Sequence, residues 1–413
     1  MRVQIIGAGI VGLSTALALV ERGCEVEVLD PLPPGNGTSR ANGGQLSYAY
    51  IAPLASPEIL HKLPKWLLAE SSPTRVYDAF DPVLWQWGAK FLRACTRRKA
   101  HNSVASLGPL GRSSQEILNR WRADYKLDFD WRANGKLVFH RDPHDFHAAR
   151  DQVAWQASLG IEQQILSPRE TVDLEPALEH LEHQIRGAVW TPTEEVGDCY
   201  KLCQELARTL RQLGGEIRQT RVTGIRVSRR RLVALTTDDG DIDSSATVVA
   251  AGIASRNLLK PLGIRLPLYP LKGYSLTYDG IDRAAVPKAS VTDYFRKTVC
   301  ARIGERLRLA GIADMDGQNL TMRPSRMALL KEQAAALLPV VAARQPAVEW
   351  VGLRPATPDG IPIIGTTRVH GLWVNAGQGA LGFTLAPASA VEVAEKIVPA
   401  GGLQQQAERE RHA

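Results

Sequence analysis

Three glycines near the start of the chain have the spacing of a dinucleotide-binding turn. Gly7, Gly9 and Gly12 stand between an apolar segment with the pattern of a strand and a longer segment with helical periodicity. In such a unit the first glycine permits a tight turn, the second lets a pyrophosphate approach the backbone, and the third lets helix and strand pack closely. The phosphates then lie at the free N–H groups of the helix N-terminus. This segment therefore predicts a dinucleotide site.

An acidic side chain closes the same unit. Asp30 follows a second predicted strand, at residues 25–29. A carboxylate in this place can accept hydrogen bonds from the ribose hydroxyl groups and would repel a 2′-phosphate. The predicted ligand is therefore FAD or NAD rather than NADP.

The C-terminal region repeats the pattern. A predicted strand at residues 372–375 is followed by the glycine-rich turn 377–382 and a predicted helix at 387–397. Two helix N-termini can then converge on one long cofactor, and the second would point its positive end at the flavin ring that carries negative charge after reduction. NAD enzymes need no second turn of this kind, so the two turns together favour FAD.

The rest of the chain divides by composition. Residues 57–189 are Trp-rich and helical around a short strand at 136–140, residues 267 to about 309 have the alternation of antiparallel strands, and a helix follows near 327–338. An α/β rhythm returns in between, with a helix at 200–213, a strand at 216–222, a hairpin through 229–237 and a strand at 247–251. We predict an α/β fold with two domains and a flexible tail at 401–413. The first is a discontinuous, Rossmann-like FAD-binding domain of the glutathione-reductase-like type, made of residues 1–56, 190–265 and 350–400. The second is an α+β substrate domain with a mixed or antiparallel sheet, made of residues 57–189 and 266–349.

Composition narrows the class of partner. The chain has 413 residues and a net charge of +7, but its basic runs at 97–99 and 229–231 are not interleaved with aromatic residues, which argues against nucleic acid. Its five cysteines lack metal-type spacing, and the histidines at 140, 144, 147, 180 and 183 are interpreted as solvated side chains, so no metal is predicted. No charged and apolar leader precedes the first strand, which favours a cytoplasmic location.

Four further stretches carry a family resemblance. They are residues 38–45 (TSRANGGQ), 269–275 (YPLKGYS), 352–360 (GLRPATPDG) and 375–384 (NAGQGALGFT). Together with residues 7–30 they resemble the D-amino acid oxidase superfamily of FAD oxidoreductases, and within it the bacterial D-amino acid dehydrogenase small-subunit family, over almost the whole chain. Arg40 and Gly43 depart from the family pattern.

The resemblance implies which residues hold the cofactor. The first turn would bind the pyrophosphate, Asp30 the ribose, Val222 the adenine through its backbone, and the last turn the isoalloxazine. The predicted set is Gly7, Gly9, Ile10, Val11, Gly12, Asp30, Ser39, Arg40, Asn42, Gly43, Gly44, Gln45, Val222, Ala251, Gly252, Gly377, Gly379, Leu381, Gly382 and Thr384. Some relatives tether flavin through a cysteine where this chain has Gly352, so the FAD is expected to be noncovalent.

The implied chemistry also selects substrate residues. An amino acid oxidised at Cα needs its carboxylate fixed, and Arg354 is the candidate because a guanidinium binds a carboxylate bidentately. Tyr274 and Tyr269 are candidates to line the pocket, and Tyr48 and Tyr50 to reach the substrate. No general base stands out, so we expect the amine to lose its proton to solvent and activity to rise with pH.

The activity implied by the resemblance is oxidative deamination of D-amino acids to 2-oxo acids and ammonia. Hydride passes from Cα to flavin N5, and the electrons pass to a quinone or another acceptor of the respiratory chain. The alternatives are an oxidase that uses oxygen, acting on glycine, D-proline or N-methyl amino acids, and a flavoprotein module that acts on tRNA. Segments 61–70 and 84–99 mix Trp, Leu and Phe with Lys and Arg, as either an ordinary amphipathic helix or a peripheral contact with the inner face of the cell membrane would.

Overall fold

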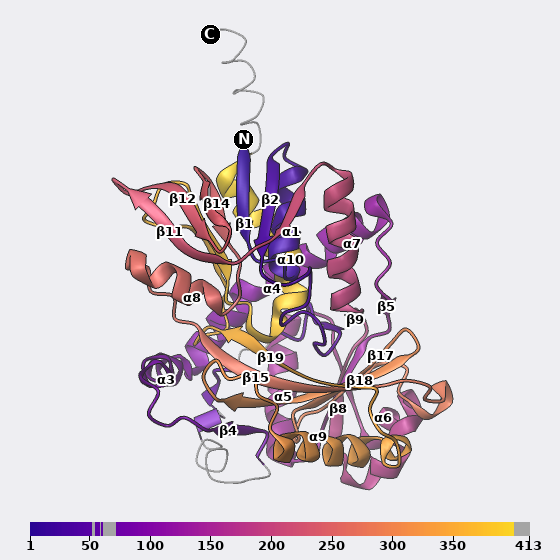
Figure 1. Ribbon diagram of the computed structural model, residues 1–413. Coiled ribbons are helices and arrows are strands. Elements are labelled where there is room, and N and C mark those ends of the chain that lie inside the picture. Colours follow the sequence, from indigo (N-terminus) through magenta and orange to yellow (C-terminus); the bar gives the residue numbers. More distant parts are fainter. Residues whose placement is uncertain (52–53, 58, 61–71, 400–413) are drawn as a thin grey trace.

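The computed structural model describes residues 1–51, 54–57, 59–60 and 72–399 (Figure 1). The predicted segment 61–70 and the predicted tail 401–413 lie outside these ranges. In Figure 1 a parallel sheet with its helices occupies the upper half of the molecule, and a larger mixed sheet lies below it. The predicted combination of a Rossmann-like α/β domain with a second, α+β domain is confirmed.

The upper sheet has six strands in the order β10-β2-β1-β14-β21-β20. Five of them are parallel, and β20 runs antiparallel to β21. Its strands are β1 (Arg2–Ile6), β2 (Glu25–Asp30), β10 (Glu216–Gln219), β14 (Thr247–Val249), β20 (Ile363–Thr366) and β21 (Leu372–Ala376). The associated helices are α1 (Ile10–Val20), α4 (Arg97–Tyr125), α7 (Cys199–Gln212), α8 (Ala254–Leu259) and α10 (Gly382–Ile397). Helix α1 is buried against α7 and α10 because its apolar residues lie on nearly every side.

The lower sheet has nine strands, eight in the order β19-β15-β18-β17-β16-β6-β8-β7, with β4 paired to β18. The pairs β16–β6 and β18–β4 are parallel and the others antiparallel. The strands are β4 (Thr74–Val76), β6 (Lys136–His140), β7 (Gln164–Leu166), β8 (Gly187–Thr191), β15 (Tyr269–Tyr278), β16 (Ser290–Asp293), β17 (Thr298–Ile303), β18 (Arg306–Met315) and β19 (Val348–Ala356). The helices around it are α3 (Pro82–Ala94), α5 (Pro143–Ala157), α6 (Pro168–Leu174) and α9 (Pro324–Leu337).

Two small sheets complete the fold. One joins β3 (Gln45–Leu46), β9 (Glu195–Val196) and β5 (Arg132–Ala133), and the other is the meander β11 (Val222–Ser228), β12 (Arg231–Thr237) and β13 (Gly240–Asp243). Short 3₁₀ helices are η1 (Pro176–Gln184), η2 (Lys260–Leu262), η3 (Arg283–Ala285), η4 (Pro339–Val341) and η5 (Gly379–Leu381).

The structure corrects three boundaries. The strand predicted at 216–222 is two strands, because the chain turns at Thr220 and enters the meander at Val222. The helix predicted to begin at Pro387 begins at Gly382, so the proline lies inside its second turn. Strand β19, within the range predicted for the cofactor domain, pairs with β15 in the lower sheet, which moves that boundary beyond Ala356.

Candidate functional site

The first turn has the geometry that its glycines require. Gly7 has φ +116°, and a Cβ on it would lie 2.5 Å from the Ala250 carbonyl oxygen. A Cβ on Gly12 would lie 1.8 Å from the Gly7 carbonyl oxygen, so the helix can approach the strand only without a side chain there. Gly9 differs, because its Cβ would have only the Ser39 hydroxyl within 4 Å, at 3.5 Å. Gly9 therefore leaves open space beside the helix N-terminus.

That open space belongs to a cavity of about 440 Å³ between the two large sheets. A second cavity of about 370 Å³ continues from it toward the meander. The residues shared by both walls are Gly7, Asp30, Pro31, Ala251 and Ala254. The two cavities thus form one elongated site that runs from the meander, past the first turn, to the lower sheet.

Most of the predicted cofactor residues meet in this site. Those on the wall of the larger cavity are Gly7, Gly9, Ile10, Val11, Asp30, Ser39, Asn42, Gly43, Gly44, Gln45, Ala251, Gly252, Gly379 and Gly382. Val222 lines the second cavity. The structure therefore brings together segments that are up to about 370 residues apart in the sequence, as the repeated turn predicted.

Five predicted residues line neither cavity. They are Gly12, Arg40, Gly377, Leu381 and Thr384. Arg40 instead donates to Asn36 Oδ1 at 2.9 Å and lies over the Tyr200 ring, and Thr384 accepts from the Ser47 backbone N–H at 3.0 Å.

Sequence reasoning also missed part of the wall. Trp350, Asn375 and Gln378 line the larger cavity. Gln378 donates to Asn375 Oδ1 at 2.7 Å, and Asn375 donates to the Thr15 hydroxyl of α1 at 3.1 Å, which ties the two turns together. The signal for Asn375 and Gln378 was their place beside the glycines of the second turn, since polar side chains there have a ligand within reach.

Asp30 stands where the two cavities meet. Its carboxylate accepts from the backbone N–H groups of Ala8, at 2.7 Å, and Leu32, at 2.8 Å. Burial raises the pKa of Asp30, and the two backbone donors oppose this rise. Each oxygen has a further lone pair, so Asp30 can hold the turn and still accept a hydrogen bond from a ribose hydroxyl.

Arg354 lies at the other end of the site, on β19. Its guanidinium occupies the space over Gly273 of β15, where a Cβ would lie 2.3 Å from Nη2. Its Nη1 donates to the Ile312 carbonyl oxygen at 3.1 Å. No carboxylate among the described residues forms an ion pair with it, and burial lowers its pKa. A cation so placed in a cavity wall is suited to an anionic ligand.

The carbonyl that holds Arg354 belongs to a strained residue. Ile312 has φ +60°, a value that is a genuine outlier for a β-branched side chain. It lies where the register of β15 and β18 shifts between Lys272 and Tyr274, at a β-bulge. Such conformations persist where the surrounding structure enforces them, and they gather at functional sites. Here the bulge turns the carbonyl toward the guanidinium.

The four candidate tyrosines have different surroundings. Only Tyr274 lines the cavity; it is buried, and burial together with the Asp314 carboxylate raises its pKa, so it stays protonated. Tyr269 accepts from the Gly317 N–H at 3.3 Å and packs on Trp87. Tyr48 donates to Glu195 at 3.1 Å, and the Tyr50 ring faces a lysine. The last three pack behind the wall of the site.

The comparisons with known proteins agree with this site. The family model described as DAO, FAD dependent oxidoreductase, matches residues 2–396. The chain belongs to this family. It is 44% identical to "D-amino acid dehydrogenase 2" of Ralstonia nicotianae over 96% of both chains, and 44% identical to the protein of that name from Pseudomonas aeruginosa over 96% of this chain and 94% of the other. Among solved structures, glycine oxidase from Geobacillus kaustophilus shares the fold, with a TM-score of 0.77 at 21% identity, covering 96% of this chain and 94% of the other.

FAD is the cofactor of this family, and the residues of the site fit it. The cavity wall is open at Gly9 and Gly252, where a Cβ would meet one atom or none within 4 Å. Asp30 and the N-terminus of α1 supply the acceptor and the N–H donors that a ribose and a pyrophosphate need. The second turn brings the N-terminal end of α10 to the same cavity.

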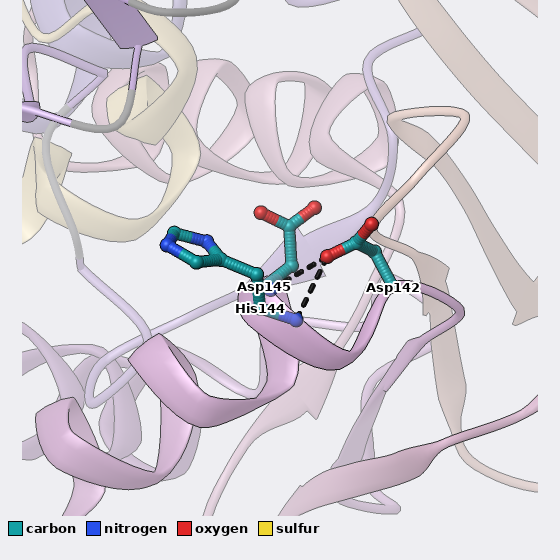
Figure 2. Close-up of side chains that lie close together, drawn as sticks. All are labelled: Asp142, His144 and Asp145. Carbon is teal, nitrogen blue, oxygen red and sulfur yellow. Dashed lines mark hydrogen bonds between the residues drawn. The ribbon is translucent and has the colours of Figure 1, made fainter.

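Two of the histidines that were interpreted as solvated have different surroundings in the structure. His140 is buried on β6, with its ring 4.6 Å from that of Tyr294, so that interpretation was wrong for this residue. His144 is exposed and lies near Asp142 and Asp145, within the reach of one ion (Figure 2). Asp142 Oδ1, however, accepts from the backbone N–H groups of His144 and Asp145, at 2.8 and 3.1 Å. This arrangement is that of a helix N-cap.

Proposed function

We propose that the protein is an FAD-dependent D-amino acid dehydrogenase, which deaminates D-amino acids oxidatively to 2-oxo acids and ammonia. Two relatives that are 44% identical over nearly the whole chain carry the name D-amino acid dehydrogenase 2. The structural observation that carries the proposal is the Arg354 guanidinium, which lines the cavity with no carboxylate partner among the described residues.

In the proposed reaction the chain binds and orients the substrate. Arg354 holds the carboxylate bidentately, and the ring of Tyr274, which lines the same wall, packs beside it while the buried hydroxyl faces Asp314. Bound FAD would supply the acceptor for the hydride that leaves Cα. Arg354 is partly buried in the cavity wall, where electrostatic contacts to the carboxylate are stronger than in bulk water.

No side chain of the described wall is suited to act as a general base. The titratable residues that line the larger cavity are Asp30, Tyr274 and Arg354. Asp30 lies at the nucleotide end and binds two backbone N–H groups, and the other two are donors. The substrate ammonium group must therefore lose its proton to solvent before the hydride leaves.

The test is an anaerobic titration of the purified protein with D- and L-amino acids, glycine, sarcosine and D-proline, followed by admission of air. Bleaching of the flavin by D-amino acids with slow recovery in air is the expected result. Rapid recovery with peroxide would instead identify an oxidase of the glycine, D-proline or N-methyl amino acid type; the chain shares its fold with a glycine oxidase. Absence of bleaching by every compound, with salt-dependent retention on tRNA, would favour the RNA alternative.

We further propose that electrons pass to a quinone at a membrane surface through contact around α3. Phe80 and Trp85 are 93% and 67% exposed, although aromatic side chains usually find a buried partner. The other face of α3 is buried through Trp87 and Phe91. Exposed basic residues follow at Lys90, Arg93, Arg97, Arg98 and Lys99. An aromatic face beside basic side chains suits the interface of an anionic bilayer.

In this proposal the protein contacts the membrane surface and does not cross the bilayer. No helix among the described residues has both the length and the apolar character needed to cross a bilayer. Cosedimentation with vesicles that contain anionic lipid tests it: Trp85→Ser should reduce the bound fraction, whereas Phe295→Ser serves as the matched control, because Phe295 is also exposed (54%) but lies between β16 and β17. Equal binding of wild type and Trp85→Ser would refute this surface.

A further inference from the structure

A buried lysine stands directly behind the wall of the cofactor site. Lys136, on β6, is 4% exposed, and its ammonium group donates to Gln45 Oε1 at 3.1 Å and to the Ser47 hydroxyl at 2.9 Å. The ring of Tyr50 lies 4.3 Å from the same nitrogen. Gln45 itself lines the larger cavity. The lysine is thus separated from the ligand space by one side chain.

The orientation of the Gln45 amide follows from this contact. An ammonium group has only donors, so the amide oxygen must face Lys136. The amide nitrogen in turn donates to the Ser290 hydroxyl of β16. Both ends of the amide are therefore held by the lower sheet, and the side chain cannot turn without breaking a buried contact.

Gln45 lies at the reactive end of the site rather than at its nucleotide end. Gly43, two residues before Gln45, packs on the lower sheet. A Cβ added to Gly43 would lie 3.1 Å from Val299 and 3.7 Å from Ala310. Both of these residues line the larger cavity together with Tyr274 and Arg354, and neither lines the second cavity. The loop that begins beside Gly9 has therefore reached the substrate side by residue 43.

The charge of Lys136 is only partly compensated. Glu194 is the acidic group that opposes it, but the Glu194 carboxylate already accepts from three backbone N–H groups, those of Tyr48, Ala49 and Tyr50, at 2.8–2.9 Å. Burial lowers the pKa of Lys136 to about 8, and Glu194 opposes this shift. A buried ammonium group is costly, so its retention beside a cofactor site calls for a role.

We propose that Lys136 is a positioning residue for the bound flavin, which fixes the Gln45 side chain against it and stabilises its reduced, negatively charged form. The inference concerns the cofactor of the family, so it does not depend on the proposed amino acid substrate. Arg308 is a second buried cation behind the same loop: it donates to the Asn42 carbonyl at 2.9 Å, and its Nη2 lies 4.0 Å from the Asp198 carboxylate. Since Asp198 compensates Arg308, the proposal rests on Lys136.

The decisive measurement is the midpoint potential of the bound FAD in wild type and in Lys136→Met, between pH 7 and pH 9.5. We expect reduced FAD to lose about tenfold more affinity than oxidised FAD in the variant at pH 7, which lowers the two-electron potential by about 30 mV. The difference must shrink above pH 8, where wild type also loses the charge in its oxidised form. The other ionisable groups near Lys136 are Glu194 and Tyr50, with Tyr294 beyond Tyr50.

A matched control separates this effect from the loss of any buried lysine. Lys272 is fully buried on β15 and paired with Asp316, and it lines neither cavity. Lys272→Met should leave the potential unchanged. Equal potentials in wild type and Lys136→Met, an equal shift in Lys272→Met, or a difference that persists unchanged at pH 9.5 would each overturn the proposal.

Wild type alone provides a second test, which holds even where Lys136→Met fails to retain FAD. Reduction should raise the pKa of Lys136, so the protein takes up an additional proton on reduction above pH 8. The potential should then fall with pH more steeply above pH 8 than just below it, by about 30 mV per pH unit. A slope that does not steepen between pH 7 and pH 9.5 would overturn the proposal, whatever amino acid the enzyme oxidises.

Discussion

Replacement of Arg354 by methionine should weaken substrate binding strongly without weakening the fold. Of its five N–H donors one is used by the protein, for the Ile312 carbonyl, which leaves the others for a carboxylate. Two charge-assisted hydrogen bonds of about 1.5–3 kcal/mol each correspond to a total of about 3–6 kcal/mol. At 1.4 kcal/mol per factor of ten, the Kd for D-alanine should rise by about 10²- to 10⁴-fold.

The same variant should keep the stability of wild type. Methionine removes a desolvated cation that has no ion-pair partner among the described residues, and this gain offsets the loss of one hydrogen bond, worth about 1 kcal/mol. Arg326 is the matched control, because it is 1% exposed and forms two contacts with Asp314 at 2.7 and 3.1 Å. Arg326→Met leaves a buried carboxylate without its partner and should cost about 3–5 kcal/mol.

Both quantities can be measured on the same preparations. Anaerobic bleaching of the flavin by D-alanine gives the apparent Kd, and thermal unfolding followed by tryptophan fluorescence gives Tm. Wild-type affinity in Arg354→Met would refute the assignment of Arg354 to the carboxylate. A loss of Tm as large as that of Arg326→Met would show instead that Arg354 serves the fold.

Three further outcomes follow from the site. Gly12→Ala should abolish FAD retention, because the added Cβ would lie 1.8 Å from the Gly7 carbonyl oxygen. Retention is read from the ratio of flavin to protein absorbance. Gly88→Ala is the control and should retain FAD fully, because a Cβ on Gly88 would meet no atom within 4 Å. Tyr274→Phe should leave KM for D-alanine nearly unchanged, because it keeps the ring that lines the cavity and removes a hydroxyl that is buried toward Asp314. The rate of flavin reduction at low substrate concentration should rise with pH as the substrate amine loses its proton. The rise should persist in Tyr274→Phe, because burial keeps the pKa of Tyr274 above this range. A rate independent of pH would contradict the absence of a general base.

The parts of the site that could be predicted are those that local spacing determines. The turn around Gly7 and Gly12 is required by contacts within one strand–helix unit, and its sequence pattern is correspondingly strict. The wall beside Arg354 is different, because it depends on the bulge at Ile312, and a positive φ at an isoleucine has no signal in the sequence. The helix start at Gly382 was missed for a similar reason, since Pro387 is typical of a first helical turn but is accommodated here in the second.

Long-range polar contacts could not be predicted either. Lys136, Glu194 and Gln45 come from three separate segments; Gln45 was predicted as a cofactor residue, but Lys136 and Glu194 each have the sequence signal of an exposed polar residue. Lys136 and Glu194 are buried beside Gln45 because β3 pairs with β9, and because Gly135, just before β6, donates its N–H to the Glu194 carbonyl oxygen at 2.9 Å. The same assembly explains the mistaken exposure of His140, which follows Lys136 on β6 and is covered by Phe146 and Tyr294.

The distribution of charge explains how such a site can oxidise an amino acid with few reactive side chains. The acid at the nucleotide end, Asp30, is engaged by backbone donors, while the reactive end holds the cation Arg354 and, behind the wall, Lys136 and Arg308. The Arg354 cation attracts a carboxylate and also disfavours the ammonium form of the substrate amine, so it promotes loss of the proton that must leave before the hydride does. Binding, deprotonation and stabilisation of the reduced cofactor then draw on one electrostatic field, which accounts for the lack of a dedicated base on the described wall.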